Sequence, residues 1–151
     1  MKIIRYQDSQ GSIHYGAQRP DGSALQIVGD IFGDFKVTGH VVKPGKLLAP
    51  LVPVNILAIG LNYKKHAEEG GKGVPAQPML FLKSTNSLQN PGDPIEIPQK
   101  LASTEVDFEC ELAVVIGKRC KNVAKADALN HVLGYTCAND VSARDWQIRW
   151  G

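Results

Sequence analysis

The sequence predicts an α+β fold in which strands predominate. Short β-prone runs outnumber helical segments, and turn clusters rich in glycine, proline, asparagine and aspartate separate them. Strands and helices do not alternate regularly, which argues against a doubly wound parallel sheet. The length of 151 residues, 43% of them hydrophobic, fits one ordinary domain or one domain with a small appendage.

The N-terminal part of the chain has the pattern of a small β domain over residues 1–45. Three β-prone runs separated by turn clusters predict two hairpins. These runs are residues 2–6, 12–17 and 24–28. Three prolines between residues 44 and 53 then interrupt regular structure. We therefore expect a linker at about residues 44–53 and a second domain over residues 54–151.

The second domain is expected to combine short strands with short helices. The predicted strands are residues 54–59, 79–83, 105–116 and 134–139. Three helices are expected after polar capping residues: over 63–69 after Asn62, over 124–132 after Asn122, and through Gln147 after Ser142.

Charge and cysteine content exclude several classes of protein. The net charge of +2, from 17 basic and 15 acidic residues, gives no reason to expect nucleic acid or an anionic membrane as a partner. No apolar run is long enough to span a membrane, and the N-terminus lacks the features of a secretory signal or a mitochondrial transit peptide. Three cysteines without a CxxC spacing argue against a disulfide framework or a zinc site. A reducing cytoplasm fits best, with the cysteines as small buried hydrophobic side chains.

The predicted strand at 105–116 carries three carboxylates on one face. Alternate side chains of a strand share a face, so Asp107, Glu109 and Glu111 lie together, followed by apolar residues. Crowded carboxylates on a half-buried strand need protons, basic partners or a cation, and carboxylate oxygens favour hard cations such as Mg²⁺, Mn²⁺ or Ca²⁺. A solvated edge strand remains the alternative. Asp140, at the end of a following strand, adds a second acidic signal.

Two further groups of residues could carry chemistry. His66 and Glu69 lie three residues apart on the predicted helix, where a carboxylate could orient the histidine as a general base. A charged surface helix explains them equally well. Arg144 and Gln147 follow Asp140 closely and could line a pocket for an acid, or belong to a helix that packs Trp146 inward.

Four motifs, taken in order, resemble the fumarylacetoacetate hydrolase family. They cover about residues 54–149, and the small β unit before them is similar to the leader domain of many members. The motifs are GLNYxxHAxE from Gly60, PMLFLK from Pro78, VDFECELAVVIGK from Val106, and GYTxxNDVSARDxQ from Gly134.

The resemblance implies a mixed β-sandwich roll, usually dimeric, with a divalent metal ion, Mg²⁺ or alternatively Mn²⁺ or Ca²⁺. By resemblance the metal ligands are Glu109, Glu111 and Asp140. His66 and Glu69 match the family's water-activating pair, and Gln147 matches a glutamine near the substrate. Arg144 and Lys83 also match family positions and are expected to contact the substrate.

Members of that family act on small 2-oxo and 2,4-dioxo acids. The resemblance therefore implies a cytoplasmic, metal-dependent hydrolase or lyase that cleaves carbon–carbon bonds of acylpyruvate-type or fumarylpyruvate-type acids. Alternatives at the same site are oxaloacetate decarboxylation and enol–keto tautomerisation. Family catalytic domains continue beyond Gly151, so the chain is expected to be truncated at its C-terminus. A catalytically inactive structural or interaction module is the alternative of another class.

Overall fold

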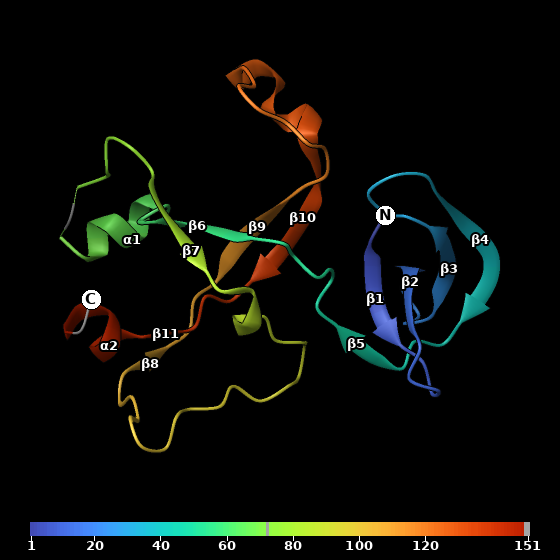
Figure 1. The fold of residues 1–151 in the computed structure, drawn as a ribbon, viewed down its shortest axis with the longest axis horizontal. Coiled ribbons are helices and arrows are strands. Elements are labelled where there is room, and N and C mark those ends of the chain that lie inside the picture. Colours follow the sequence, from blue (N-terminus) through green and yellow to red (C-terminus); the bar gives the residue numbers. More distant parts are fainter. Residues whose placement is uncertain (72, 150–151) are drawn as a thin grey trace.

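The computed structural model describes residues 1–71 and 73–149 and confirms a fold made mainly of strands (Figure 1). Strands β1 to β5 form one sheet near the N-terminus, and the later strands form three two-stranded sheets. Only short helices accompany them.

The N-terminal sheet is antiparallel, with the strand order β4-β3-β2-β1-β5. Its strands are β1 (Ile3–Gln7), β2 (Ile13–Gln18), β3 (Ala24–Gly29), β4 (Phe35–Val42) and β5 (Lys46–Leu48). Buried residues lie on both faces of the sheet, because the register pairs Ala17 with Ile3 and so places it on the face opposite to Ile4. The core forms two clusters, one around Ile4, Tyr6 and Ala24, and the other around Ala17, Ile27 and Ile31.

Two strands of this sheet were missing from the prediction. Strand β4 pairs with β3 along most of its length, although the sequence predicted only three strands here. Strand β5 lies inside the segment expected to lack regular structure and pairs with β1. The prolines flank β5 without entering it, and a three-residue edge strand needs backbone donors on one side only. The division into domains at about residues 44–53 stays a prediction.

The remaining strands pair as hairpins or short bridges. Strands β6 (Ile56–Gly60) and β7 (Met79–Lys83) are antiparallel, as are β9 (Glu111–Ile116) and β10 (Val132–Ala138). Strands β8 (Val106–Asp107) and β11 (Ser142–Ala143) form a third pair. In Figure 1 the last residues of β7 and β10 lie beside the start of β9 near the middle of the molecule.

The strand predicted over residues 105–116 is interrupted, which corrects one expectation. Residues 108–110 lie outside both β8 and β9, because β8 pairs with β11 whereas β9 pairs with β10. At the break, the backbone N–H of Glu109 donates to the side-chain oxygen of Asn139 over 2.8 Å instead of to a neighbouring strand. The carboxylate side of this segment is half-buried, and the apolar side chains of Leu112, Val114 and Ile116 are exposed.

The helices are shorter than expected, and the predicted cap is absent. Helix α1 (Lys64–Glu69) starts after Tyr63, with no side-chain hydrogen bond at the cap, so Asn62 does not cap it. Residues Lys125–His131 form a 3-10 helix, η2, instead of an α-helix. Upstream of η2, Asn122 lies at a bend and adopts the left-handed backbone conformation, with a φ of 57°. A second 3-10 turn, η1, covers Thr85–Ser87, and α2 covers Arg144–Arg149.

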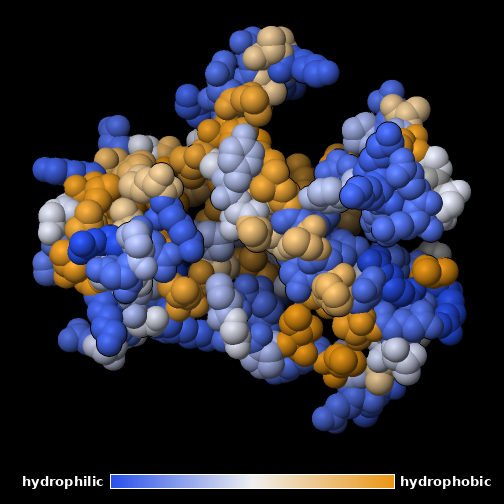
Figure 2. Space-filling model, turned by 180° about the vertical axis from the view of Figure 1, so that it is seen from behind, coloured by the Kyte–Doolittle hydropathy of each residue, from blue (hydrophilic) through white to orange (hydrophobic). Residues whose placement is uncertain are grey.

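Burial is concentrated in the N-terminal sheet. Within the described residues, Ala67 is the one buried hydrophobic residue after Ala49. Figure 2 shows hydrophobic side chains at the surface along the column that descends from the protruding η2 segment. The three cysteines, Cys110, Cys120 and Cys137, are exposed and free, which corrects the expectation that they are buried. They lie on strands and loops that no other described part of the chain covers.

No helix in residues 1–71 and 73–149 is long and apolar enough to cross a membrane.

Candidate metal centre

Three carboxylates meet where β9, β10 and the break before β9 come together. One oxygen from each of Glu109, Glu111 and Asp140 lies within 4.8 Å of the others. Glu109 comes from the break between β8 and β9, Glu111 opens β9, and Asp140 follows β10. All three are partly buried. The register explains the meeting, because Glu111 pairs with Ala138, two residues before Asp140.

Burial and neighbouring carboxylates both disfavour the charged form of Glu111. The pKa of Glu111 is raised, first by burial and then by the negative charges of Glu109 and Asp140. Lys83 and His66 lower it, and these contributions are smaller. A proton or a cation at this point would relieve the repulsion.

Two basic side chains contact the cluster from outside. The Nζ of Lys83, at the end of β7, contacts the Oδ1 of Asp140. The guanidinium of Arg144, at the start of α2, contacts the Oε1 of Glu109 and also donates to Asp107 over 2.8 Å. The carboxylates of Glu109 and Asp107 raise the pKa of Arg144. Arg144 also donates to the Oε1 of Gln147 over 3.0 Å.

The three carboxylates fit a divalent cation. Their oxygens are hard ligands of the kind that Mg²⁺, Mn²⁺ and Ca²⁺ select, and they converge from separate backbone segments. Burial and the negative charges of Glu109 and Asp140 together raise the pKa of Glu111. The donor set therefore matches such an ion by both chemistry and charge.

His66 and Glu69 both lie on α1, and no hydrogen bond or ion pair joins their side chains among the described residues. Across the described part of the chain, neither side chain forms a hydrogen bond or an ion pair, and both are exposed. His66 is close enough to Glu111 for its charge to lower the pKa of that carboxyl. The expected orientation of the histidine by Glu69 is therefore not formed in this structure.

Sequence reasoning missed the contacts of three residues that shape the site. Tyr63 joins α1 to β9, because its hydroxyl oxygen accepts a hydrogen bond from the backbone N–H of Leu112 over 2.8 Å. Asn139 holds the backbone of Glu109, and Asp107 anchors Arg144. Tyr63 and Asn139 belong to the motifs noted in the sequence, yet no spacing rule predicts a contact between residues so far apart in the chain.

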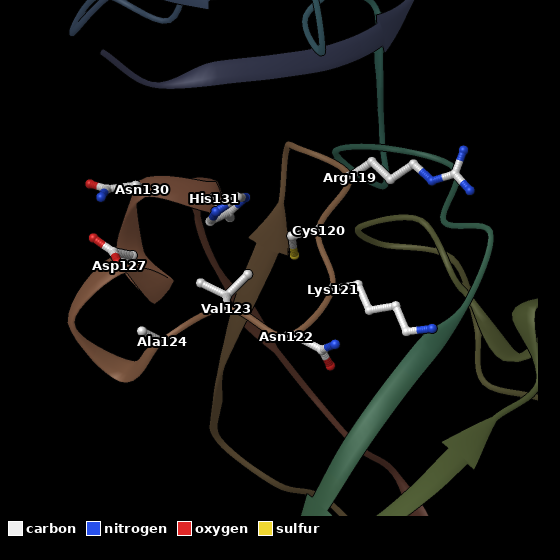
Figure 3. Close-up of a pocket in the computed structure, with 9 residues that line it drawn as sticks. All are labelled: Arg119, Cys120, Lys121, Asn122, Val123, Ala124, Asp127, Asn130 and His131. Carbon is white, nitrogen blue, oxygen red and sulfur yellow. The ribbon is translucent and has the colours of Figure 1, made fainter.

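A surface depression lies away from the acidic cluster. It has a volume of about 730 Å³ and is formed by the loop before η2 together with η2 itself. Figure 3 shows that Arg119 and Lys121 extend to one side while Asp127 and Asn130 point to the other. These side chains do not converge on a common point.

Two family models match the chain. The model described as "Fumarylacetoacetate (FAA) hydrolase C-terminal" matches residues 55–150. The model described as "Rv2993c-like, N-terminal" matches residues 1–50. The first match contains every residue of the candidate site.

Relatives and solved structures carry related names. The chain is 52% identical over 104 residues to "Oxaloacetate tautomerase fahd2, mitochondrial" of Xenopus laevis. The matched region covers 68% of this chain and 32% of that protein. It is similar to the crystal structure of a 5-carboxymethyl-2-hydroxymuconate delta-isomerase from Mycobacterium smegmatis, with 34% identity, a TM-score of 0.84, and 99% and 58% of the two chains covered. A fumarylacetoacetate hydrolase from Exiguobacterium antarcticum gives 29% identity and a TM-score of 0.81, covering 99% and 59%.

The chain spans only part of these relatives. It covers between 32% and 59% of the length of the curated proteins compared. It covers 57% to 59% of the solved structures while matching nearly all of its own length.

Proposed function

The chain belongs to the fumarylacetoacetate hydrolase family, and from that premise we propose that it acts, with a divalent metal ion, on small 2-oxo or 2,4-dioxo acids. The observation that carries the proposal is the cluster of Glu109, Glu111 and Asp140, with their oxygens within 4.8 Å of one another and a basic side chain on either side. Keto–enol tautomerisation is the reaction that we favour. The names of the Xenopus relative and of the M. smegmatis structure support it.

Each residue then has a defined role. Glu109, Glu111 and Asp140 hold the ion, for which Mg²⁺ is the first choice and Mn²⁺ or Ca²⁺ the alternatives. When bound, the ion stabilises the negative charge that develops on the oxygens of the oxo-acid. His66 transfers the proton between the carbon next to the carbonyl group and the oxygen. Arg144, Lys83 and Gln147 orient the carboxylate of the substrate.

A second candidate is cleavage of a carbon–carbon bond at the same cluster, either by hydrolysis or by decarboxylation. Hydrolytic cleavage requires His66 and Glu69 to activate water together, and the two side chains would have to approach each other first. The name of the Exiguobacterium structure supports this candidate. Tautomerisation requires no water and is compatible with the separation of His66 from Glu69.

The wider setting is also proposed. We expect two domains joined at about residues 44–53, a homodimer, and a reducing cytoplasm. The three free cysteines are compatible with that compartment. The partner is a small oxo-acid, and neither nucleic acid nor a membrane surface is expected to bind.

The proposal is tested first by metal binding and then by turnover. Mn²⁺ binding to the 151-residue chain is measured by titration calorimetry, and the decay of enol-oxaloacetate is followed by absorbance with Mn²⁺ or Mg²⁺ present. Glu111→Gln removes one ligand and should lower both metal affinity and the tautomerisation rate by about 100-fold or more. His66→Asn should lower the rate by about 100-fold while leaving Mn²⁺ binding almost unchanged.

The matched control is Glu96→Gln, which removes an exposed carboxylate on the loop before β8. It should change neither quantity. A folded wild-type chain that binds no Mn²⁺ would overturn the proposal. Metal binding without turnover of enol-oxaloacetate, acylpyruvates or oxaloacetate would instead support an inactive binding module.

A further inference from the structure

The two basic side chains around the acidic cluster are not equivalent. Arg144 has three acceptors, namely Glu109, Asp107 and Gln147, so it remains anchored if one contact is lost. Lys83 makes one contact, with the Oδ1 of Asp140, and has no second hydrogen bond or ion pair within residues 1–71 and 73–149. Lys83 is therefore the cation that can leave its carboxylate without breaking other interactions.

The contact of Lys83 involves the same carboxylate that the metal centre requires. Asp140 is the less exposed member of the ion pair, because 12% of its side-chain surface is accessible to solvent, against 29% for Lys83. The ammonium therefore covers a largely buried carboxylate that a metal ion would have to reach. An ammonium and a divalent cation a few ångströms apart repel each other strongly in a partly desolvated site. Each cation therefore weakens the contact of the other with Asp140.

The formal charges around the cluster indicate which ligand would follow the metal ion. Three carboxylates with Lys83 and Arg144 carry a formal charge of −1, or −2 when Asp107, which Arg144 also contacts, is counted. A divalent ion changes these values to +1 or 0, and a site that has lost its negative charge in this way favours an anionic carboxylate as its next ligand. The ammonium of Lys83 becomes available for that anion at the moment when it loses Asp140.

We propose that Lys83 is a displaceable counter-cation: it neutralises Asp140 in the metal-free protein, competes with the metal ion for that carboxylate, and once displaced binds the carboxylate of the oxo-acid. This inference rests on the proposed metal-dependent function. Because Lys83 opposes the metal and favours the anion, it couples the two binding events, so that metal strengthens anion binding and the anion strengthens metal binding.

Removing the charge of Lys83 separates this role from a merely structural one. If Lys83 competes with the ion, Lys83→Met should tighten Mn²⁺ binding, on the order of tenfold, because the competing cation is gone. If Lys83 only holds the site in shape, the same substitution should weaken Mn²⁺ binding. Both explanations predict a lower melting temperature without metal, so the sign of the change in metal affinity decides between them.

The experiment measures Mn²⁺ and oxalate binding to the 151-residue chain, by titration calorimetry and by the electron paramagnetic resonance signal of free Mn²⁺. The chains compared are wild type, Lys83→Met, Lys83→Gln and Lys83→Arg, with Lys36→Met as the matched control because Lys36 is exposed on β4. We expect both neutral variants to bind Mn²⁺ more tightly and, when loaded with Mn²⁺, to bind oxalate on the order of tenfold more weakly. Lys83→Arg should behave like wild type.

Each other result overturns the inference. Weaker or unchanged Mn²⁺ binding in the folded neutral variants would show that Lys83 does not compete with the ion. Unchanged oxalate binding would show that the displaced ammonium does not contact the anion. Absence of Mn²⁺ binding in folded wild type would overturn the proposed function as well, whereas normal wild-type binding with the wrong sign in the variants would overturn this inference alone. If Lys83→Met does not fold, Lys83→Gln gives the same comparison.

Discussion

A single aspartate organises the first turn of the N-terminal sheet. The Oδ1 of Asp8 accepts hydrogen bonds from the backbone N–H groups of Gln10 and Ser12, each over 2.9 Å. Its Oδ2 lies 2.8 Å from the Nε2 of His14. The contact with His14 is the main reason why the pKa of Asp8 is lowered, and the backbone donors lower it further. One carboxylate therefore supports the turn and ties it to β2.

Asp8→Asn should lower stability at neutral pH, and the loss should disappear in acid. Because the folded-state pKa of Asp8 lies below its ordinary value of 3.8, the ionised carboxylate stabilises the fold above that value, and this contribution is lost as pH falls through the folded pKa. Urea unfolding from pH 7 down to about pH 2 measures it. Asp34→Asn is the control, since its exposed side chain makes no hydrogen bond among the described residues. A deficit that persists unchanged in acid would contradict this account.

At the scale of elements, two glycines at turns distinguish backbone strain from steric conflict. Gly22 and Gly29 both have positive φ, at 83° and 96°. A Cβ at Gly22 would meet nothing within 4 Å, whereas one at Gly29 would lie 2.3 Å from the carbonyl oxygen of Asp34. Gly22→Ala should therefore cost about 1–2 kcal/mol from backbone conformation alone. Gly29→Ala should cost about 3 kcal/mol or more, because β3 and β4 must also separate.

Urea unfolding of the two variants at one pH makes the comparison, and Ala substitution at Gly39 provides the control. Gly39 lies in β4 without positive φ and with open space around a Cβ. Equal losses of unfolding free energy at Gly22 and Gly29 would show that the hairpin relaxes around the new methyl group. The steric clash at Gly29 would then add nothing to the cost of the substitution.

Elements with strong local patterns were predictable from sequence, and elements defined by distant partners were not. Strands β1, β2, β3 and β7 and helix α1 fall within two residues of the expected runs, because alternation, turn residues and helical spacing act locally. Strand β5 was not predicted, because its pairing with β1 joins segments about forty residues apart in the chain. The expected strand over 105–116 was divided for the same reason, since its two halves pair with different strands.

The candidate site was only half predictable from residues. The alternation of side chains along a strand correctly predicted that Glu109 and Glu111 lie together. Because the strand is broken at 108–110, however, they do not share the face of one continuous strand. The meeting with Asp140 depends on the register of β9 with β10. The contacts of Lys83 and Arg144 with the cluster follow from tertiary structure that no local pattern encodes. The roles of these residues stay predictions until metal and substrate binding are measured.

At the scale of the whole molecule, burial is uneven. Among the residues that the structure describes, seven of the eight buried hydrophobic ones lie between Ile4 and Ala49, and Ala67 is the eighth. In the second half, apolar strand faces remain open, with Leu57, Leu82 and Leu112 each about 60% exposed or more. Local stability follows buried apolar contact, so the two halves of this chain should differ in how often their backbone hydrogen bonds open.

Hydrogen exchange followed by mass spectrometry should therefore show two levels of protection in the 151-residue chain. Backbone amides of β1 to β3 should exchange most slowly, and those of β6, β7, β9 and β10 should exchange much faster although they are also paired. Mn²⁺ should slow exchange around Glu109 to Glu111 and at the end of β10, because a ligand that binds only the folded form stabilises it by mass action. The amides of β1 to β3 should not respond.

Equal protection in both halves without metal would show that exposed apolar strand faces do not weaken these hairpins. A uniform response to Mn²⁺ would show that the acidic cluster and the N-terminal sheet unfold as one cooperative unit.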